Sequence, residues 1–154
     1  MSKKDKTNVM RILDQKKIDY QAVDWEQSPP AEIKGIPVYK TLVTVGKSGD
    51  HYVFVIPVSR ELDLKKAAAA VDEKNIHMIK EKELLPLTGY VHGGCSPIGM
   101  KKEFVTCIDQ SALAQERIMF SAGKVGHSVA LEVNDIDRVL PVSYHDLATD
   151  PSDE

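Results

Sequence analysis

The feature that most constrains the fold is a pair of strand-like runs, residues 38–45 and 51–58, separated by Gly46-Lys47-Ser48-Gly49-Asp50. Both runs are rich in β-branched and aromatic residues, which favour strands. The connection between them is polar and holds two glycines, as is typical of a turn between antiparallel strands. The pattern therefore predicts a β-hairpin, and the fold cannot be a purely parallel sheet.

Shorter runs on both sides of the hairpin predict further strands and helices. Thr7 can cap a first helix, and Asp63 can cap a second one over residues 64–71. Pro86 is expected to stop a short third helix. The remaining predicted elements are strands at 20–25, 76–79, 104–108, 117–120 and 129–133, a short helix capped by Ser111, and a last helix at 135–140 capped by Asn134. This succession favours an α+β domain with a mixed, mostly antiparallel and barrel-like sheet, or a closed barrel, and helices packed outside.

Chain length predicts one folding unit. A chain of 154 residues, 42% of them hydrophobic, can bury one core without disulfides or a structural metal. We expect a single domain over residues 1–145 and an acidic, disordered tail over 146–154. No apolar run approaches the roughly 20 residues that span a bilayer, and the first six residues are mostly charged. These features predict a cytoplasmic protein with no membrane partner.

Charge and cysteine content narrow the possible functions. The formal net charge of −3 argues against indiscriminate binding of nucleic acid, so an RNA partner would need a local basic patch. The candidates for such a patch are Lys65, Lys66, Lys101, Lys102 and Lys124. Cys95 and Cys107 are too few for a disulfide framework and lack the ligand spacing of a zinc site. We therefore expect reduced thiols, no metal and no cofactor.

Lys40 is the first candidate functional residue, because it stands inside a predicted strand. Alternation places Lys40 and Leu42 on one face of the strand and Tyr39 and Thr41 on the other. A lysine in this position either lies on the solvated face or is directed into a cavity, and the first case is commoner because buried lysines are rare unless paired. A register shift of one residue would exchange the two faces, so the pattern leaves both interpretations open.

Two glycine-rich segments are the other candidate binding elements. Small residues in the first, residues 92–102, allow main-chain N–H groups to approach an anion, although a plain tight turn explains the same pattern and no nucleotide-binding fingerprint is present. The second, residues 121–128, holds two glycines and two serines between predicted strands, where a long hairpin connection is the simpler interpretation. Cys95 and His92 could act as nucleophile and base only if a third group orients them.

Four blocks occur in a fixed order along the chain. They are Val38-Tyr39-Lys40-Thr41-Leu42-Val43, Leu62-Asp63-Leu64-Lys65-Lys66-Ala67-Ala68, Thr88-Gly89-Tyr90 with Gly93-Gly94-Cys95-Ser96-Pro97-Ile98-Gly99, and Ser121-Ala122-Gly123-Lys124. In residues and spacing they resemble the YbaK/EbsC family, which is related to the editing domain inserted in bacterial prolyl-tRNA synthetases. The resemblance spans roughly residues 7–142, and four ordered blocks are far more specific than any one of them.

The resemblance implies a barrel-like α/β domain that deacylates mischarged transfer RNA, with Cys-tRNA carrying the proline anticodon as the usual substrate. It implies that Lys40 is the catalytic residue. It also implies that Thr41, Gly93, Gly94 and Ser121 bind the substrate.

Two further positions are expected to bind substrate, although the chain departs from the family there. Trp25 stands where the family commonly has an aromatic residue in the pocket. Ser128 stands where some members carry an aspartate, and its lack of a carboxylate weakens any mechanism that needs a base at this position. The loop from Glu26 to Pro37 is shorter than in better-known members and lacks a helix that helps to close the pocket.

The mechanism that the resemblance implies needs no nucleophile from the protein. The sequence offers no Ser–His–Asp or Cys–His arrangement, and the thiol of the substrate can attack its own ester. Transfer RNA is the expected partner, prolyl-tRNA synthetase is a further candidate, and a monomer is favoured. Additional action on Cys-tRNA(Cys), an Ala-tRNA(Pro) deacylase that activates water, and a non-catalytic module that binds aminoacyl-tRNA or a synthetase are the alternatives.

Overall fold

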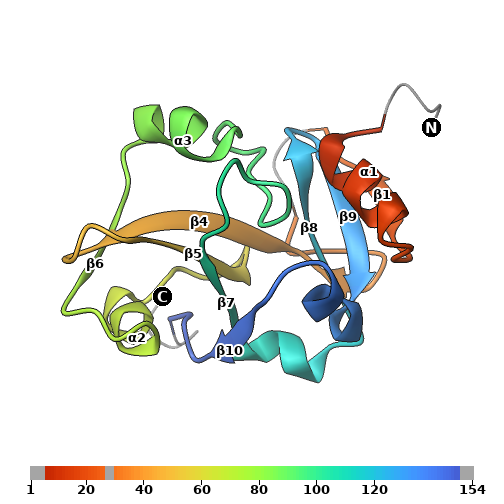
Figure 1. The fold of residues 1–154 in the computed structure, drawn as a ribbon. Helices are drawn as coiled ribbons and strands as arrows, with labels where there is room; N and C mark the ends of the chain where they lie inside the picture. Colours follow the sequence, from red (N-terminus) through yellow and green to blue (C-terminus); the bar gives the residue numbers. More distant parts are fainter. Residues whose placement is uncertain (1–5, 27–29, 150–154) are drawn as a thin grey trace.

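The computed structural model describes residues 6–26 and 30–149, which form an α+β domain (Figure 1). Its elements are α1 (Asn8–Gln15), β1 (Gln21–Asp24), β2 (Glu32–Ile33), β3 (Ile36–Pro37), β4 (Tyr39–Gly46), β5 (His51–Pro57), α2 (Leu64–Ala70), β6 (Ile76–Met78), α3 (Glu81–Thr88), β7 (Val105–Asp109), the 3₁₀ helix η2 (Gln110–Ala114), β8 (Arg117–Lys124), β9 (His127–Glu132), the 3₁₀ helix η3 (Val133–Arg138) and β10 (Ser143–His145). No helix in the described ranges is long and apolar enough to cross a membrane.

Two main sheets organise the domain. The larger has the strand order β10-β7-β5-β4-β6, and the smaller has the order β1-β9-β8. Antiparallel pairing predominates, and β7 runs parallel to both of its neighbours, β5 and β10. The expected mixed, mostly antiparallel architecture with helices outside is therefore confirmed.

The closed barrel considered from the sequence is not formed within residues 6–26 and 30–149. An isolated parallel bridge between Val38 and Met119 joins the two main sheets. On the outer edge of the larger sheet, β6 pairs with β4 only at residues 44–46. The part of β4 between this pairing and the bridge at Val38 is thus paired with β5 along one edge, but among the described residues it has no strand partner along the other edge.

The β4–β5 hairpin separates two apolar clusters, because successive side chains of a strand point to opposite faces. Val53 and Val55 belong to the main core, which α1 and the smaller sheet complete. Phe54 and Ile56 point the other way, toward α2. The small side chain of Ala67 lets α2 lie close against them, and Figure 1 shows α2 and α3 on opposite sides of the larger sheet.

Side-chain caps start two helices as the sequence predicted. The Thr7 hydroxyl accepts a hydrogen bond from the Met10 N–H at 3.2 Å, and the Asp63 carboxylate accepts from the N–H groups of Lys65 and Lys66. Each cap satisfies donors that the first helical turn leaves without an intrahelical acceptor.

Pro86 does not stop its helix, so this prediction was wrong. Proline removes one N–H donor, but α3 continues to Thr88. The Thr88 hydroxyl donates to the Leu84 carbonyl oxygen at 2.7 Å, and Gly89 ends the helix with φ +89° and an N–H bond to Leu85. A left-handed glycine is the usual way to satisfy terminal carbonyl groups.

The predicted caps of the last two helices were also wrong. Asp109, rather than Ser111, caps η2 by accepting from the Ser111 N–H at 3.1 Å. Glu132 precedes η3, and Asn134 lies inside that helix. Both elements are 3₁₀ helices, and each begins two residues earlier than the predicted cap implied.

The C-terminal segment is folded further than expected. Leu147 and Ala148 are buried, and their N–H groups donate to the carboxylate of Asp109 at 2.9 and 3.0 Å. The predicted tail over 146–154 therefore begins too early, because residues 146–149 belong to the domain. Residues 150–154 lie outside the described part of the chain, as do residues 27–29 of the loop predicted over 26–37.

Candidate functional site

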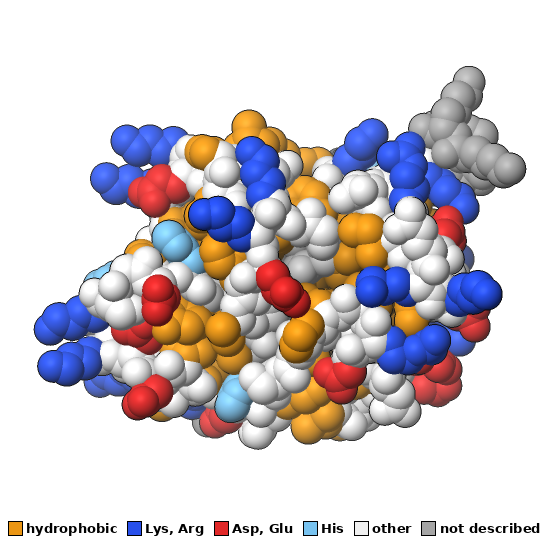
Figure 2. Space-filling model, viewed as in Figure 1, with side chains coloured by type: hydrophobic (Ala, Val, Ile, Leu, Met, Phe, Trp, Pro, Cys, Tyr) orange, Lys and Arg blue, Asp and Glu red, His pale blue; other side chains and the backbone are white. Residues whose placement is uncertain are grey.

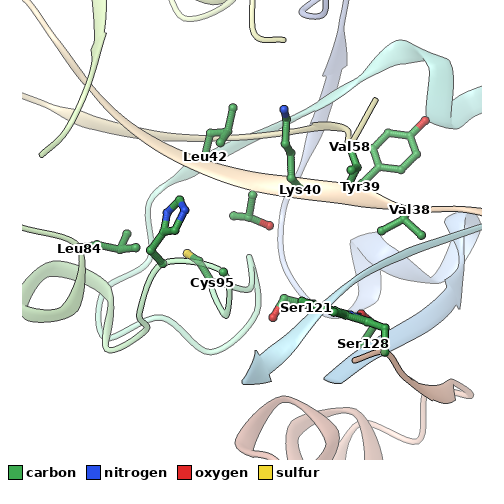
Figure 3. A pocket seen from close by; sticks show the side chains of 13 residues that line it. Val38, Tyr39, Lys40, Leu42, Val58, Leu84, Cys95, Ser121 and Ser128 are labelled. Atoms are coloured by element: carbon green, nitrogen blue, oxygen red, sulfur yellow. The ribbon is translucent and has the colours of Figure 1, made fainter. Parts of the chain in front are cut away.

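A cavity of about 260 Å³ opens between the two main sheets, at the part of β4 that, among the described residues, has a strand partner along one edge only. It lies beside the segment that follows α3 and the β8–β9 hairpin (Figure 3). Its lining consists of Trp25, Val38, Tyr39, Lys40, Thr41, Leu42, Val58, Leu84, His92, Gly93, Cys95, Ser121 and Ser128. Six of the seven residues predicted from the sequence thus share one cavity.

Lys40 lines the cavity from a different face of β4 than Thr41. Its partner across the hairpin is Ile56, and Figure 3 shows Lys40 and Leu42 on one side of β4 with Ser121 on the other. The side chain is 28% exposed, and its Nζ atom lies 3.9 Å from Oε2 of Glu61. Because the Glu61 side chain is 77% exposed, this ion pair is weak and leaves the ammonium group available to an anion.

Thr41 presents the most informative polar atom of the cavity. Its hydroxyl oxygen is buried and has no hydrogen-bond partner among the described residues. Leaving a buried hydroxyl unpaired costs about 1–3 kcal/mol. An orphan group of this kind in a cavity wall is satisfied when a polar ligand enters.

Gly93 and Gly94 have different surroundings. Gly93 lines the cavity with φ +84°, a conformation that favours glycine. Gly94 is not among the lining residues; a Cβ atom added there would lie 2.9 Å from the backbone nitrogen of Val125. Gly94 therefore packs closely against the β8–β9 turn, and its expected binding role stays a prediction.

Ser121 and Ser128 lie directly opposite each other on β8 and β9. The predicted 121–128 loop is thus the end of a hairpin, with a bulge between Ser121 and Lys124. Ser121 Oγ accepts from the Gly123 N–H at 3.1 Å, and Ser128 Oγ accepts from the indole N–H of Trp25 at 3.0 Å. Trp25 and Ser128 are 103 residues apart, and only the pairing of β1 with β9 brings them together.

The thiol of Cys95 also lines the cavity, but it is a poor nucleophile. Burial raises the pKa of Cys95 to about 12, so the reactive thiolate is scarce at neutral pH. The hydrogen-bonding side chain that acts on the pKa of Cys95 is that of Thr88, not that of His92. The geometry therefore gives no support to the Cys–His pair considered from the sequence.

The cavity wall contains no aspartate or glutamate among the described residues, and its charged lining group is Lys40. Groups of three or more His, Cys, Asp or Glu side chains that could hold a metal are also absent from the described ranges. The arrangement can bind a polar, anionic ligand and stabilise developing negative charge, but it offers no carboxylate base. Apolar lining residues such as Leu84 and Val58 were missed because nothing local distinguishes them from core residues.

The lysines considered for an RNA patch divide into two groups. Lys65 and Lys66 lie on α2, where Lys66 contacts Asp146 at 3.2 Å. The side chain of Lys101 packs beside Gly89 at the end of α3, and the backbone of Lys124 packs beside Gly94. Figure 2 shows Lys and Arg side chains over α3, at the far left end and, in larger number, on the right side over α1 and β9.

Comparison with known proteins links this chain to the editing of aminoacyl-tRNA. The sequence pattern described as the aminoacyl-tRNA editing domain matches residues 26–139. EbsC of Enterococcus faecalis, named as a Cys-tRNA(Pro)/Cys-tRNA(Cys) deacylase, is 43% identical over 136 residues, which cover 82% of this chain and 83% of EbsC.

Two solved structures have the same fold. One, described as a trans-editing enzyme for prolyl-tRNA synthetase, has a TM-score of 0.77 and 19% identity, with 94% of this chain and 99% of that chain covered. The other, the hypothetical protein APE2540, has a TM-score of 0.80 and 17% identity, with 93% and 100% covered. At these identities the likeness concerns the fold alone.

Proposed function

The chain belongs to the family of aminoacyl-tRNA editing domains, and from this premise we propose that it removes cysteine in trans from Cys-tRNA(Pro). Cys-tRNA(Cys) is a second candidate substrate, which the name of the Enterococcus relative suggests. The reaction would take place in the cytoplasm, where mischarged transfer RNA arises, with prolyl-tRNA synthetase as a candidate partner and a monomer as the working form.

The observation that carries the proposal is the chemistry of the cavity wall. Its described residues include no carboxylate, and the thiol of Cys95 stays protonated. A substrate that brings its own nucleophile fits such a cavity better than one that needs an activated water. Cysteine is the amino acid whose side chain supplies this nucleophile.

In the proposed reaction the sulfur of the cysteinyl group attacks its own carbonyl carbon. A C–S bond forms, the C–O bond to the terminal ribose breaks, and the thiol proton ends on the ribose oxygen. The products are a four-membered cyclic thioester and free transfer RNA. Intramolecular attack reaches effective molarities on the order of 10⁵–10⁸ M when geometry is enforced, so binding in the right shape supplies much of the catalysis.

Lys40 and Thr41 have complementary roles in this proposal. Lys40 offers positive charge to the terminal phosphate or to the developing oxyanion, after releasing its weak contact with Glu61. The unpaired hydroxyl of Thr41 binds the ribose or the α-amino group. Gly93 leaves room for the terminal nucleotide, and Lys101 and Lys124 attract the acceptor end toward the cavity.

The test follows ester loss from three substrates: Cys-tRNA(Pro), Ser-tRNA(Pro), in which a hydroxyl replaces the thiol, and Ala-tRNA(Pro). We expect rapid loss of cysteine only, and a rate at least about 10²-fold lower for Lys40→Ala, the range seen when a charge-stabilising group is removed. Lys47→Ala, which removes an exposed lysine from the β4–β5 turn, is the matched control and should retain the wild-type rate.

Other outcomes identify the alternatives. Loss of alanine would contradict the thiol mechanism and indicate a water-activating deacylase, for which His92 is the lining base. Absence of ester loss from all three substrates, combined with retained binding of transfer RNA, would indicate a non-catalytic binding module.

A further inference from the structure

The two serines of the cavity form a matched pair of hydroxyl groups. Ser121 and Ser128 are direct partners across β8 and β9, so their side chains share one face of the sheet. Side chains in such a pair have Cβ atoms about 5 Å apart. Both hydroxyls line the cavity, and both can therefore reach the same ligand atom.

The hydrogen bonds that these two serines already make determine whether their hydroxyl groups can donate to a ligand. Each Oγ atom accepts from an N–H group: that of Gly123 for Ser121, and the indole of Trp25 for Ser128. An indole N–H can only donate, so Ser128 must be the acceptor in its contact with Trp25. No described residue accepts a hydrogen bond from either hydroxyl, so both O–H hydrogens are left for a ligand.

Trp25 is held firmly enough to orient Ser128. Its backbone N–H donates to the Gly126 carbonyl oxygen at 2.9 Å, and β1 pairs with β9 at Val23 and Ser128. Ser128 is only 2% exposed, so bulk water does not compete for its hydroxyl. The indole is thus a fixed positioning group for this hydroxyl.

We propose that Trp25 orients Ser128 as a hydrogen-bond donor to the carbonyl oxygen of the scissile ester, with Ser121 as the second donor. The inference rests on the proposed function and adds the position and polarity of its oxyanion site. As sulfur attacks the carbonyl carbon, negative charge develops on this oxygen, and two preoriented donors stabilise it. Position 128 therefore requires a hydrogen-bond donor, whereas a carboxylate at this position would supply an acceptor and a base.

Substitutions at position 128 separate a donor from a base. Ser128→Ala should lower kcat for Cys-tRNA(Pro) by about 10²-fold with little change in KM, as loss of one oxyanion donor does. Ser128→Asp should be at least as slow at pH 7, because an ionised carboxylate cannot donate and faces the developing charge. Ser128→Thr keeps the hydroxyl and should retain most of the activity. Ser143→Ala, which removes an exposed hydroxyl from β10, is the control and should leave kcat unchanged.

The positioning role of Trp25 has its own readout. Trp25→Phe keeps an aromatic ring but removes the indole N–H, so we expect kcat to fall about tenfold. In the double variant with Ser128→Ala the two effects should not add, because the indole acts through the serine hydroxyl. Trp25 is the only tryptophan of the chain, so its fluorescence reports the contact directly and should change in Ser128→Ala but not in Ser143→Ala.

Contrary results would separate this inference from the proposed function. A Ser128→Asp variant as fast as or faster than wild type would show that the position serves a base, and an unchanged kcat in Ser128→Ala would remove the donor role; in both cases the deacylase assignment stands. Wild-type protein that releases no cysteine would overturn the proposed function, and the carbonyl role of Ser128 with it.

Discussion

The carboxylate of Asp109 is expected to be a major determinant of stability. It is 3% exposed and accepts hydrogen bonds from the backbone N–H groups of Ser111, Leu147 and Ala148. These contacts tie the C-terminal segment and η2 to the end of β7. Through Ser111, whose hydroxyl lies 2.7 Å from the Tyr39 hydroxyl, the same network reaches the cavity wall.

The perturbation is Asp109→Asn, which preserves the shape of the side chain. A carboxylate accepts hydrogen bonds at both oxygens, whereas the amide accepts only at its one oxygen. One charge-assisted hydrogen bond worth about 1.5–3 kcal/mol is therefore lost, and the other two become neutral hydrogen bonds that are weaker by about 0.5–1 kcal/mol each. The free energy of unfolding should therefore fall by about 2.5–5 kcal/mol. For a chain of this length that corresponds to a decrease in Tm of about 5–20 °C.

The assay is urea unfolding followed by circular dichroism, together with a thermal scan. Asp146→Asn, which removes an exposed carboxylate beside Lys66, is the control and should change stability by less than about 0.5 kcal/mol. An Asp109→Asn variant within about 0.5 kcal/mol of wild type would refute the reasoning, because the three N–H groups would then be satisfied without the carboxylate.

The same comparison has a defined pH dependence. Burial opposes the charge on Asp109, but hydrogen bonds from Ser111, Leu147 and Ala148 outweigh it and lower the pKa below 3.8. A lowered pKa in the folded state stabilises the protein at pH values above the pKa of the unfolded chain, and this contribution is lost as the pH falls through the folded pKa. The difference between wild type and Asp109→Asn should be constant near neutral pH and should shrink below about pH 4.

Two other residues give independent predictions. Gly94→Ala should lower the free energy of unfolding by about 1–3 kcal/mol and slow deacylation, because the added Cβ would press on the backbone at Val125. The control Gly49→Ala, where only the backbone conformation is strained, should cost about 1 kcal/mol in the same urea titration and leave the rate unchanged. Equal effects of the two variants on the rate would contradict the packing role of Gly94. Burial raises the pKa of Cys95 to about 12, so this thiol should react slowly with a thiol reagent in the native protein at pH 8 and rapidly after denaturation. Fast labelling of Cys95 in the native protein at pH 7 would be inconsistent with its burial.

Local features of the sequence determined the main elements of this protein. The hairpin of β4 and β5 was predicted because alternation and a polar turn lie within about 20 consecutive residues. The caps Thr7 and Asp63 were predicted because a capping side chain binds N–H groups two or three residues away. The ordered blocks indicated the family for the same reason, since each block is a short continuous segment.

Only the tertiary structure decided how distant segments meet. Leu147 and Ala148 looked like part of an acidic tail, and the carboxylate of Asp109, 38 and 39 residues earlier in the chain, binds them into the domain. The close approach of Gly94 to the backbone of Val125 likewise joins segments that lie far apart in the sequence.

The cavity residues show the same difference between what the local sequence indicates and what the tertiary structure decides. Lys40, Thr41 and Ser121 could be selected from the sequence, but the face that each presents depends on strand register, which a shift of one residue would invert. The bond between Trp25 and Ser128 joins residues 103 positions apart. It exists because β1 pairs with β9 in one register, and that pairing is set by burial of the whole core rather than by any local signal.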